Sequence, residues 1–197
     1  MKKIPTLFKR VYNNGVARLT MECTEGCAWV FDGKGDATVK YDGACCAVID
    51  GELYKRFDAK KGREIPTGAI PCGDADPITG HFPHWVKLDP KNNADKWYFK
   101  AFEHYFADNA KENWTYEAIG KHFNGNPYNL DYDTVVPHGR DIITDMCDVP
   151  RMYFDIRDYL RNHYIEGIVF WKDGEPRCKI KRTDFGFEWN GKTQKRG

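Results

Sequence analysis

The sequence predicts an α+β chain dominated by antiparallel sheet, on three observations. The dipeptides Asp50-Gly51 and Asp173-Gly174 each separate two strand-like segments, and Asp-Gly favours a two-residue hairpin turn. Short apolar runs recur between segments rich in Gly, Pro and Asp. Two longer stretches carry apolar side chains at helical spacing, so helices are expected to flank the sheets.

The predicted strands follow one another along most of the chain. In order they are 17–22, 28–32, 44–49, 52–57, 85–88, 115–120, 134–138, 165–171 and 177–182. Residues 60–84 are rich in Gly, Pro and Asp and are typical of a long surface loop.

The first predicted helix covers residues 95–110 and carries an aromatic stripe, which is Trp97, Tyr98, Ala101, Phe102, Tyr105 and Phe106. Such a stripe indicates packing on a sheet rather than a platform for stacking bases. A second helix is expected to start at Asp148 and Pro150. Its apolar face is Met152, Tyr153, Ile156 and Leu160.

Length and composition limit the class of protein. The 197 residues suit one domain, and a net charge of +1 means that a nucleic-acid surface must be a local patch. No apolar run is long enough to span a membrane, and residues 1–5 lack the apolar core of a signal peptide. The odd number of cysteines, seven, indicates reduced thiols. We therefore expect a cytoplasmic monomer that does not bind membranes.

Cysteines and histidines are not expected to form a structural zinc site. Cys23 and Cys27 are four positions apart, and His81 and His84 are three apart. Neither pair is followed by a second pair at metal-ligand spacing.

The tetrad Lys40-Tyr41-Asp42-Gly43 leads directly into the apolar segment 44–49. A lysine at the mouth of a buried strand is a candidate covalent nucleophile. Its amine can attack the α-phosphate of a nucleotide if its pKa is lowered and the phosphate is held in line.

The first hairpin brings an arginine towards this tetrad. If Asp50-Gly51 is a two-residue turn, Ile49 pairs with Glu52 and Cys45 faces Arg56. Arg56 then lies on the same face as Gly43. Alternatively, Arg56 simply pairs with Asp58 or Glu52.

The second hairpin gathers charged side chains. Lys179 and Lys181 share a face, and a two-residue turn at Asp173-Gly174 places Glu166 opposite Lys181 and Ile168 opposite Lys179. Pro176 leaves this register open, because it can lengthen the turn.

Such cations neutralise charge that shifts during attack on phosphorus, and they favour a neutral Lys40 amine. Glu166 can hold Mg²⁺. The alternative is that the two lysines form the solvated face of an edge strand and that Glu166 is a surface charge.

Four motifs in order resemble the motif set of covalent nucleotidyltransferases, the superfamily of ATP-dependent DNA ligases, RNA ligases and mRNA capping enzymes. They are Lys40-Tyr41-Asp42-Gly43, Tyr116-Glu117-Ala118-Ile119-Gly120, Glu166-Gly167-Ile168-Val169 and Lys179-Ile180-Lys181. The continuation from Gly120 to Tyr128 looks most like RNA ligases. The resemblance spans roughly residues 34–182.

The resemblance implies a nucleotidyltransferase (adenylation) domain with an ATP-grasp-like ligase fold at residues 1–182 and a short polar tail at 183–197. After Lys181 too little chain remains for the oligonucleotide-binding (OB) barrel that DNA ligases and capping enzymes carry. The expected fold is therefore a bare catalytic domain.

The resemblance also implies a role for each matched residue. Lys40 is expected to become the lysyl-adenylate, and Asp42 and Gly43 to shape the loop around it. Arg56 is expected to contact the nucleotide or the RNA end, and Glu117 the ribose hydroxyls. Relatives stack an aromatic ring on adenine from the next strand, and His138 is assigned there, with an ordinary loop histidine as the alternative.

The resemblance implies roles for the remaining charged residues as well. Glu166 is expected to assist Mg²⁺ and the leaving group, while Lys179 and Lys181 hold the α-phosphate of ATP. The candidate RNA contacts are Lys60, Lys61, Arg63, Arg140, Lys192, Lys195 and Arg196, which are alternatively ordinary solubilising charges.

These roles together predict an ATP-dependent RNA ligase that joins RNA 5′-phosphate and 3′-hydroxyl ends through a lysyl-AMP intermediate. One alternative is a related enzyme that acts on nicked DNA, or on RNA caps with GTP. Another is a non-catalytic nucleic-acid-binding module of the same fold. A third is a small α+β structural protein whose motifs are coincidental.

Overall fold

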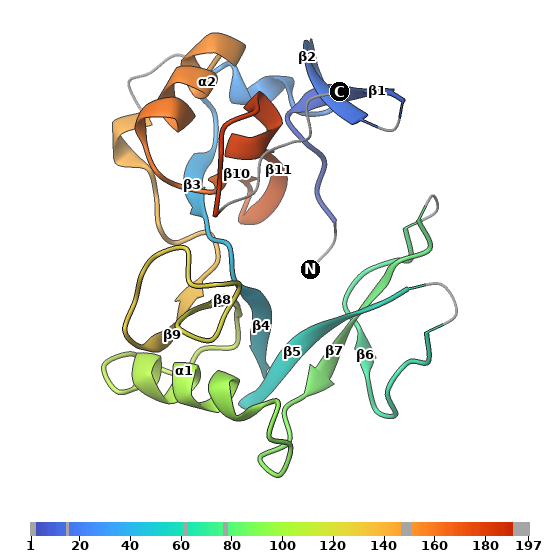
Figure 1. The fold of residues 1–197 in the computed structure, drawn as a ribbon, viewed down its shortest axis with the longest axis vertical. Coiled ribbons are helices and arrows are strands. Elements are labelled where there is room, and N and C mark those ends of the chain that lie inside the picture. Colours follow the sequence, from blue (N-terminus) through green and yellow to red (C-terminus); the bar gives the residue numbers. More distant parts are fainter. Residues whose placement is uncertain (1–2, 15, 61–62, 77–78, 147–150, 191–197) are drawn as a thin grey trace. The chain divides into compact units, whose positions relative to one another are not determined.

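A computed structural model describes residues 3–14, 16–60, 63–76, 79–146 and 151–190 (Figure 1). Two compact units make up this part of the chain. The central unit contains residues 42–138 with Lys3, and the terminal unit contains residues 4–41 and 139–190. Each unit has its own sheet and its own core, and they are described separately.

The central unit is built on a six-stranded sheet in the order β6-β7-β5-β4-β8-β9, antiparallel throughout. The strands are β4 (Ala44–Ile49), β5 (Glu52–Ala59), β6 (Ile70–Pro71), β7 (Phe82–Lys87), β8 (Thr115–Gly120) and β9 (Asp133–Pro137). Asp50 and Gly51 both have positive φ, 50° and 76°, and they form the predicted two-residue turn between Ile49 and Glu52. The predicted first hairpin is therefore confirmed.

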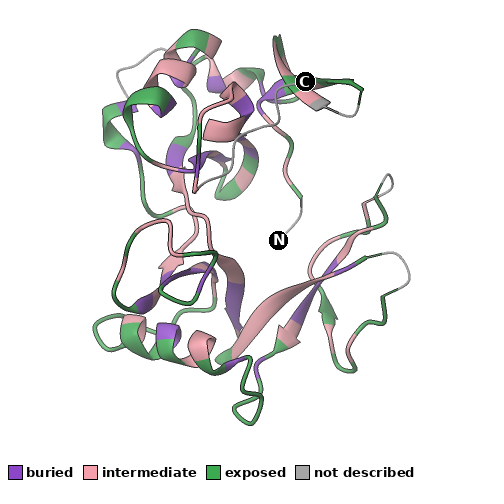
Figure 2. Cartoon of the chain, in the orientation of Figure 1, coloured by how far each residue is buried: buried purple, intermediate pink, exposed green. Residues whose placement is uncertain are grey.

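Helix α1 (Lys96–Phe106) supplies the other half of the central core. Its Phe102 meets Tyr116 of β8 edge to face, with ring centroids 5.8 Å apart. The predicted aromatic stripe thus packs on the sheet, because Phe102 and Ala101 are buried against β8 and its neighbours. Figure 2 shows the buried stretch of β4, which contains Cys46, Ala47 and Val48.

The terminal unit contains a two-stranded ribbon and a three-stranded sheet in the order β11-β10-β3, both antiparallel. The ribbon is β1 (Phe8–Asn13) with β2 (Val16–Cys23), and the sheet strands are β3 (Asp36–Lys40), β10 (Gly167–Lys172) and β11 (Glu175–Lys181). Helix α2 (Tyr153–Asn162) buries Ile156 and Leu160 in the core that Ile168, Phe170 and Ile180 share.

Strand β11 has β10 as its partner on one side, and on the other side the backbone of Lys179 bonds to the segment before β1. The Leu7 amide donates to the Lys179 carbonyl at 2.8 Å, and the Lys179 amide donates to the Pro5 carbonyl at 3.0 Å. This parallel contact contradicts the alternative that Lys179 lies on an open edge strand. The segment before β1, which the sequence analysis left unassigned, covers that edge.

Most predicted elements are present, and the differences have local causes. Residues 28–30 are a 3₁₀ turn and not the predicted strand, because the Val30 and Phe31 amides bond to carbonyls three residues back. The predicted loop 60–84 contains β6 and the start of β7. Strands β1 and β3 were missed, since both are short and carry charged residues.

The second helix starts at Tyr153, and the predicted start at Asp148 and Pro150 lies outside the described residues. Part of the predicted tail packs onto the terminal unit, where a 3₁₀ turn covers Arg182–Phe185 and Trp189 is buried. None of the described helices combines the length and apolar character needed to cross a membrane.

Candidate functional site

The first group of site residues converges in the terminal unit on the carboxylate of Glu166. Lys40 Nζ donates to Glu166 Oε2, and Lys181 Nζ donates to Glu166 Oε1 at 2.7 Å. The Glu166 side chain is only 5% exposed, so both ion pairs are shielded from solvent on the carboxylate side. A carboxylate held between two lysines from distant parts of the chain is the central feature of this unit.

The strand order explains this convergence. Strand β10 lies between β3 and β11, so its Gly167 is paired with Lys40 on one side and with Lys181 on the other. Glu166 directly precedes Gly167, and its side chain is therefore flanked by both lysines. A Cβ atom at Gly167 would lie 2.2 Å from the Ile180 carbonyl oxygen, so the close strand approach requires glycine here.

The predicted register of the second hairpin holds at Trp171 and Lys172 and is wrong by one residue from Gly167 to Phe170. Asp173 and Gly174 form a two-residue turn with positive φ, 55° and 73°. A bulge then shifts the register between Phe170 and Trp171, so Val169 and not Ile168 faces Lys179. Lys181 likewise faces Gly167 and not Glu166. Lys179 and Lys181 still share a face, as predicted.

Lys179 lies close to the other two lysines. The pKa of its ammonium group is lowered from 10.5 to about 8, by burial first and then by the positive charges of Lys40 and Lys181. Glu166 opposes part of this shift. An anion bound at Lys179 would relieve the repulsion between these three cations, which favours a phosphate ligand.

Asp184 anchors the end of β11 and was missed by the sequence analysis. Its Oδ2 accepts a hydrogen bond from the Lys181 amide at 2.8 Å, and its Oδ1 accepts from Arg10. Asp184 is 7% exposed. The signal that could have found it is its spacing, three residues after Lys181, where an acidic side chain can bond back to a turn amide.

The charges of this group suit an anion. Lys40, Lys179 and Lys181 supply three ammonium groups against the one carboxylate of Glu166, and both oxygens of that carboxylate already accept from lysines. A Mg²⁺ ion held by protein alone does not fit such surroundings, because no second carboxylate of this group offers a ligand. Both oxygens of Glu166 are thus occupied, and its predicted role as a Mg²⁺ ligand stays a prediction.

The second group lies in the central unit around Glu117 of β8. Glu117 Oε1 accepts from the Gly43 amide at 3.0 Å, and Oε2 is bonded to His138 Nε2 at 3.0 Å. His138 follows β9, and its Nδ1 lies 3.0 Å from Thr115 Oγ1. Both ring nitrogens of His138 are thus engaged, and its assigned stacking on adenine remains a prediction.

The loop of the Lys40 tetrad is held by the segment that continues the Glu117 motif. Asn124 Nδ2 donates to Asp42 Oδ1 at 3.0 Å and to the Gly43 carbonyl at 2.6 Å. The Asp42 amide donates to the Tyr128 hydroxyl at 2.5 Å. Asn124 and Tyr128 therefore position Asp42 and Gly43. From the sequence they were predicted only as part of the segment that resembles RNA ligases.

Gly43 has a packing reason to be glycine. A Cβ atom there would lie 2.1 Å from the Ala118 carbonyl oxygen on β8. This close approach of two backbones accounts for Gly43 within the central unit, in addition to the expected closeness to a nucleotide.

Arg56 forms the ion pair with Asp58 that was considered as its alternative role, with Nε 3.1 Å from Asp58 Oδ1. Ile49 pairs with Glu52 as predicted, and the observed pairing runs to Cys46 opposite Lys55. The predicted facing of Cys45 and Arg56 stays a prediction. Arg56 also lines a pocket of about 400 Å³ with Asp58, Asp76 and His81.

The structure describes three of the candidate RNA contacts, which are Lys60, Arg63 and Arg140. Lys60 is exposed, and the guanidinium of Arg63 lies 4.5 Å from the centre of the Phe57 ring. Lys61, Lys192, Lys195 and Arg196 lie outside the described residues. Arg140 belongs to the terminal unit.

The predicted site residues thus fall into two groups. Lys40, Glu166, Lys179 and Lys181 lie together in the terminal unit, while Asp42, Gly43, Glu117 and His138 lie together in the central unit, which also contains Arg56. The boundary between the units in the chain falls inside the tetrad, between Tyr41 and Asp42. A comparison with protein-family models and with curated proteins finds no match.

Proposed function

We propose that this protein is an ATP-dependent RNA ligase of the covalent nucleotidyltransferase type. The observation that carries the proposal is the convergence of Lys40, Lys179 and Lys181 around Glu166. One amine in a surplus of positive charge, with a carboxylate in hydrogen-bond contact, is a chemically suitable nucleophile for a phosphate ester.

In the first step Lys40 Nζ attacks the α-phosphorus of ATP. A nitrogen–phosphorus bond forms, the bond to the bridging oxygen breaks, and pyrophosphate leaves. Glu166 is in contact with Lys40 Nζ and is the natural acceptor for the proton that the amine must lose. Lys179 and Lys181 stabilise the negative charge on the α-phosphate oxygens.

The second and third steps follow from the resemblance. AMP passes from Lys40 to an RNA 5′-phosphate, and a 3′-hydroxyl then displaces AMP and seals the strand. Mg²⁺ that enters with the nucleotide would supply charge neutralisation on its phosphates. Glu117 is assigned to the ribose hydroxyls, Arg56 to the nucleotide or RNA end, and the protein to the cytoplasm.

The test is covalent labelling of the intact protein with ATP and Mg²⁺, read by mass spectrometry. We expect the added mass of AMP, mapped by peptide analysis to Lys40, and no label on Lys40→Arg. Arginine keeps the positive partner of Glu166 and cannot form a stable adenylate, so the variant isolates the chemistry from the fold.

Lys55→Arg is the matched control, because Lys55 is also a partly buried lysine that pairs with a buried carboxylate, Asp95. This variant should label like the wild type. A wild-type protein that gains no AMP would contradict the enzyme and favour the non-catalytic module. Labelling by GTP instead, or sealing of nicked DNA but not of RNA, would favour the related enzymes.

A further inference from the structure

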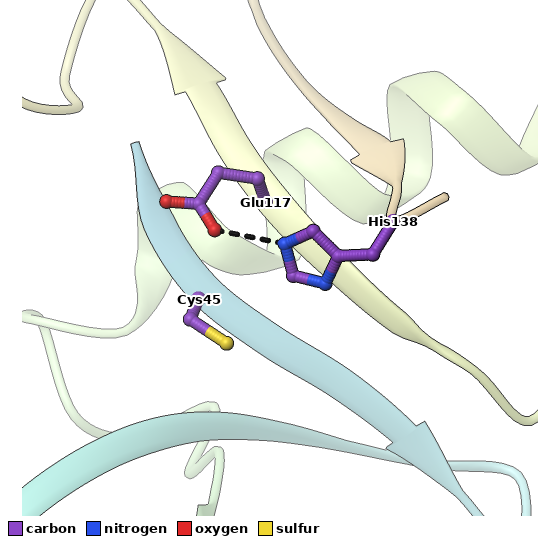
Figure 3. A group of neighbouring side chains, drawn as sticks. All are labelled: Cys45, Glu117 and His138. Atoms are coloured by element: carbon purple, nitrogen blue, oxygen red, sulfur yellow. Dashed lines mark hydrogen bonds and ion pairs between the residues drawn. The ribbon is translucent and has the colours of Figure 1, made fainter. Parts of the chain in front are cut away.

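Three side chains in the central unit bring one sulfur, one oxygen and one nitrogen ligand together. Cys45 lies on β4, Glu117 on the neighbouring β8, and His138 directly after β9 (Figure 3). Their ligand atoms all lie within 4.8 Å of one another. Among the residues that the structure describes, no other group of His, Cys, Asp and Glu side chains meets this geometry.

The spacing is close to that of a metal site. With zinc bonds of about 2.3 Å to sulfur and about 2.1 Å to nitrogen, two ligands of one tetrahedral ion lie about 3.6 Å apart. The three ligand atoms, which lie within 4.8 Å of one another, therefore need to approach by about 1.2 Å or less. Side-chain rotation is enough for this, because the backbone positions are already set by neighbouring strands β4, β8 and β9.

Outer hydrogen bonds already orient two of the ligands. His138 Nδ1 lies 3.0 Å from Thr115 Oγ1, which can accept from Nδ1–H when Nε2 binds a metal. Glu117 Oε1 accepts from the Gly43 amide at 3.0 Å, which leaves Oε2 directed at His138 Nε2. Partners of this kind are typical of the outer shell of zinc sites.

The chemistry of the three ligands selects the metal. Zn²⁺ accepts sulfur, nitrogen and oxygen ligands, and it would bind Cys45 as the thiolate, with release of the thiol proton. A divalent ion would then neutralise the charges of the Cys45 thiolate and the Glu117 carboxylate together. A sulfur ligand excludes Mg²⁺ and Ca²⁺ as the natural occupant, because these ions prefer oxygen.

We infer that Cys45, Glu117 and His138 bind Zn²⁺, with the fourth position open to water or another small donor. This site is distinct from the Cys23–Cys27 and His81–His84 pairs considered from the sequence. In the bound state Zn²⁺ takes the place of the proton shared by His138 and Glu117. Since Glu117 is also assigned to the ribose in the proposed function, Zn²⁺ would compete with nucleotide for it.

The test uses Co²⁺ as a spectroscopic probe on untagged, reduced, full-length protein without nucleotide. We expect one equivalent of Co²⁺ to produce a thiolate-to-cobalt charge-transfer band in the near-ultraviolet, which Zn²⁺ then removes by displacement. Cys45→Ser should lose this band. Its Zn²⁺ affinity, measured against a competing chelator, should fall by more than the 10–100-fold that loss of an outer-shell partner causes.

Two further variants separate this site from other thiols and from misfolding. Cys23→Ser removes a partly exposed thiol of the terminal unit and should keep the band unchanged. Thr115→Val keeps all three ligands and should weaken Zn²⁺ binding by about 10–100-fold. A band that survives in Cys45→Ser, or its absence from the wild type, would overturn the inference. Lys40 labelling uses no Co²⁺, so failure of the ligase proposal is seen separately.

Discussion

At the scale of single residues, Lys179 links the stability of the fold to pH. Its pKa is lowered to about 8, by burial first and then by Lys40 and Lys181, whereas an unfolded lysine titrates near 10.5. Between these two values the unfolded chain binds more protons than the folded chain. The free energy of unfolding is therefore reduced at pH values below 8, and it rises as the pH rises from 8 towards 10.5.

Lys179→Met should accordingly stabilise the protein at pH 7, by about 2 kcal/mol, because a partly buried ammonium group is removed and its apolar stem is retained. Urea unfolding at pH 7 and at pH 10 measures the effect, which should shrink at the higher pH as the wild-type lysine loses its proton. The exposed Lys34→Met is the control and should change stability by less than about 0.5 kcal/mol at either pH. Equal stability of Lys179→Met and wild type at pH 7 would contradict the prediction that the buried ammonium group of Lys179 destabilises the fold.

Some contacts of the candidate site could be predicted from the sequence and others could not. The motif spacing was enough to select Lys40, Glu166 and Lys181 as one charged group. It could not predict that Glu166 accepts from both lysines, because that depends on β10 lying between β3 and β11. Strand order is set by contacts between distant parts of the chain, and β3 itself, with charged residues at both ends, gave little strand signal.

At the scale of elements, the two hairpins show what turn residues can and cannot specify. Both Asp-Gly turns have the predicted two residues, yet only the first hairpin keeps the predicted register. In the second, Pro176 and the bulge beside it shift the pairing by one residue. A bulge depends on packing across the strands as well as on the local sequence, so the turn signal alone leaves the register undetermined.

The contact between β4 and β8 gives a prediction at this scale. Gly43→Ala should destabilise the protein by about 3 kcal/mol or more, because the new Cβ would lie 2.1 Å from the Ala118 carbonyl oxygen and force the strands apart. Thermal unfolding with conversion to free energy measures the change.

Gly51→Ala is the matched control for this change. It meets no atom within 4 Å and suffers only from its positive φ of 76°, so a loss of about 1 kcal/mol is expected. The interpretation fails if the two variants lose the same amount of stability.

At the scale of the whole molecule, the chain forms two cores, one from a continuous stretch of sequence and one from two separate segments. The central core, with Val48, Phe102 and Tyr116, draws only on residues 42–138. The terminal core combines segments from both sides of that stretch, such as Phe8 with Ile168. Hydrophobic periodicity predicted most of the elements that supply these cores, whereas the domain over residues 1–182 was implied by the family resemblance. Periodicity could not divide the cores, because it does not show which faces meet.

Because its core and its sheet are continuous in sequence, a fragment of residues 42–140 should fold on its own. We expect dispersed amide resonances and a cooperative thermal transition. Residues 4–41 alone should remain unfolded, because β3 needs β10 from beyond residue 139 to complete its sheet. The folded fragment retains Cys45, Glu117 and His138 and should therefore bind one Co²⁺. A fragment without dispersed resonances would mean that the central core depends on the rest of the chain.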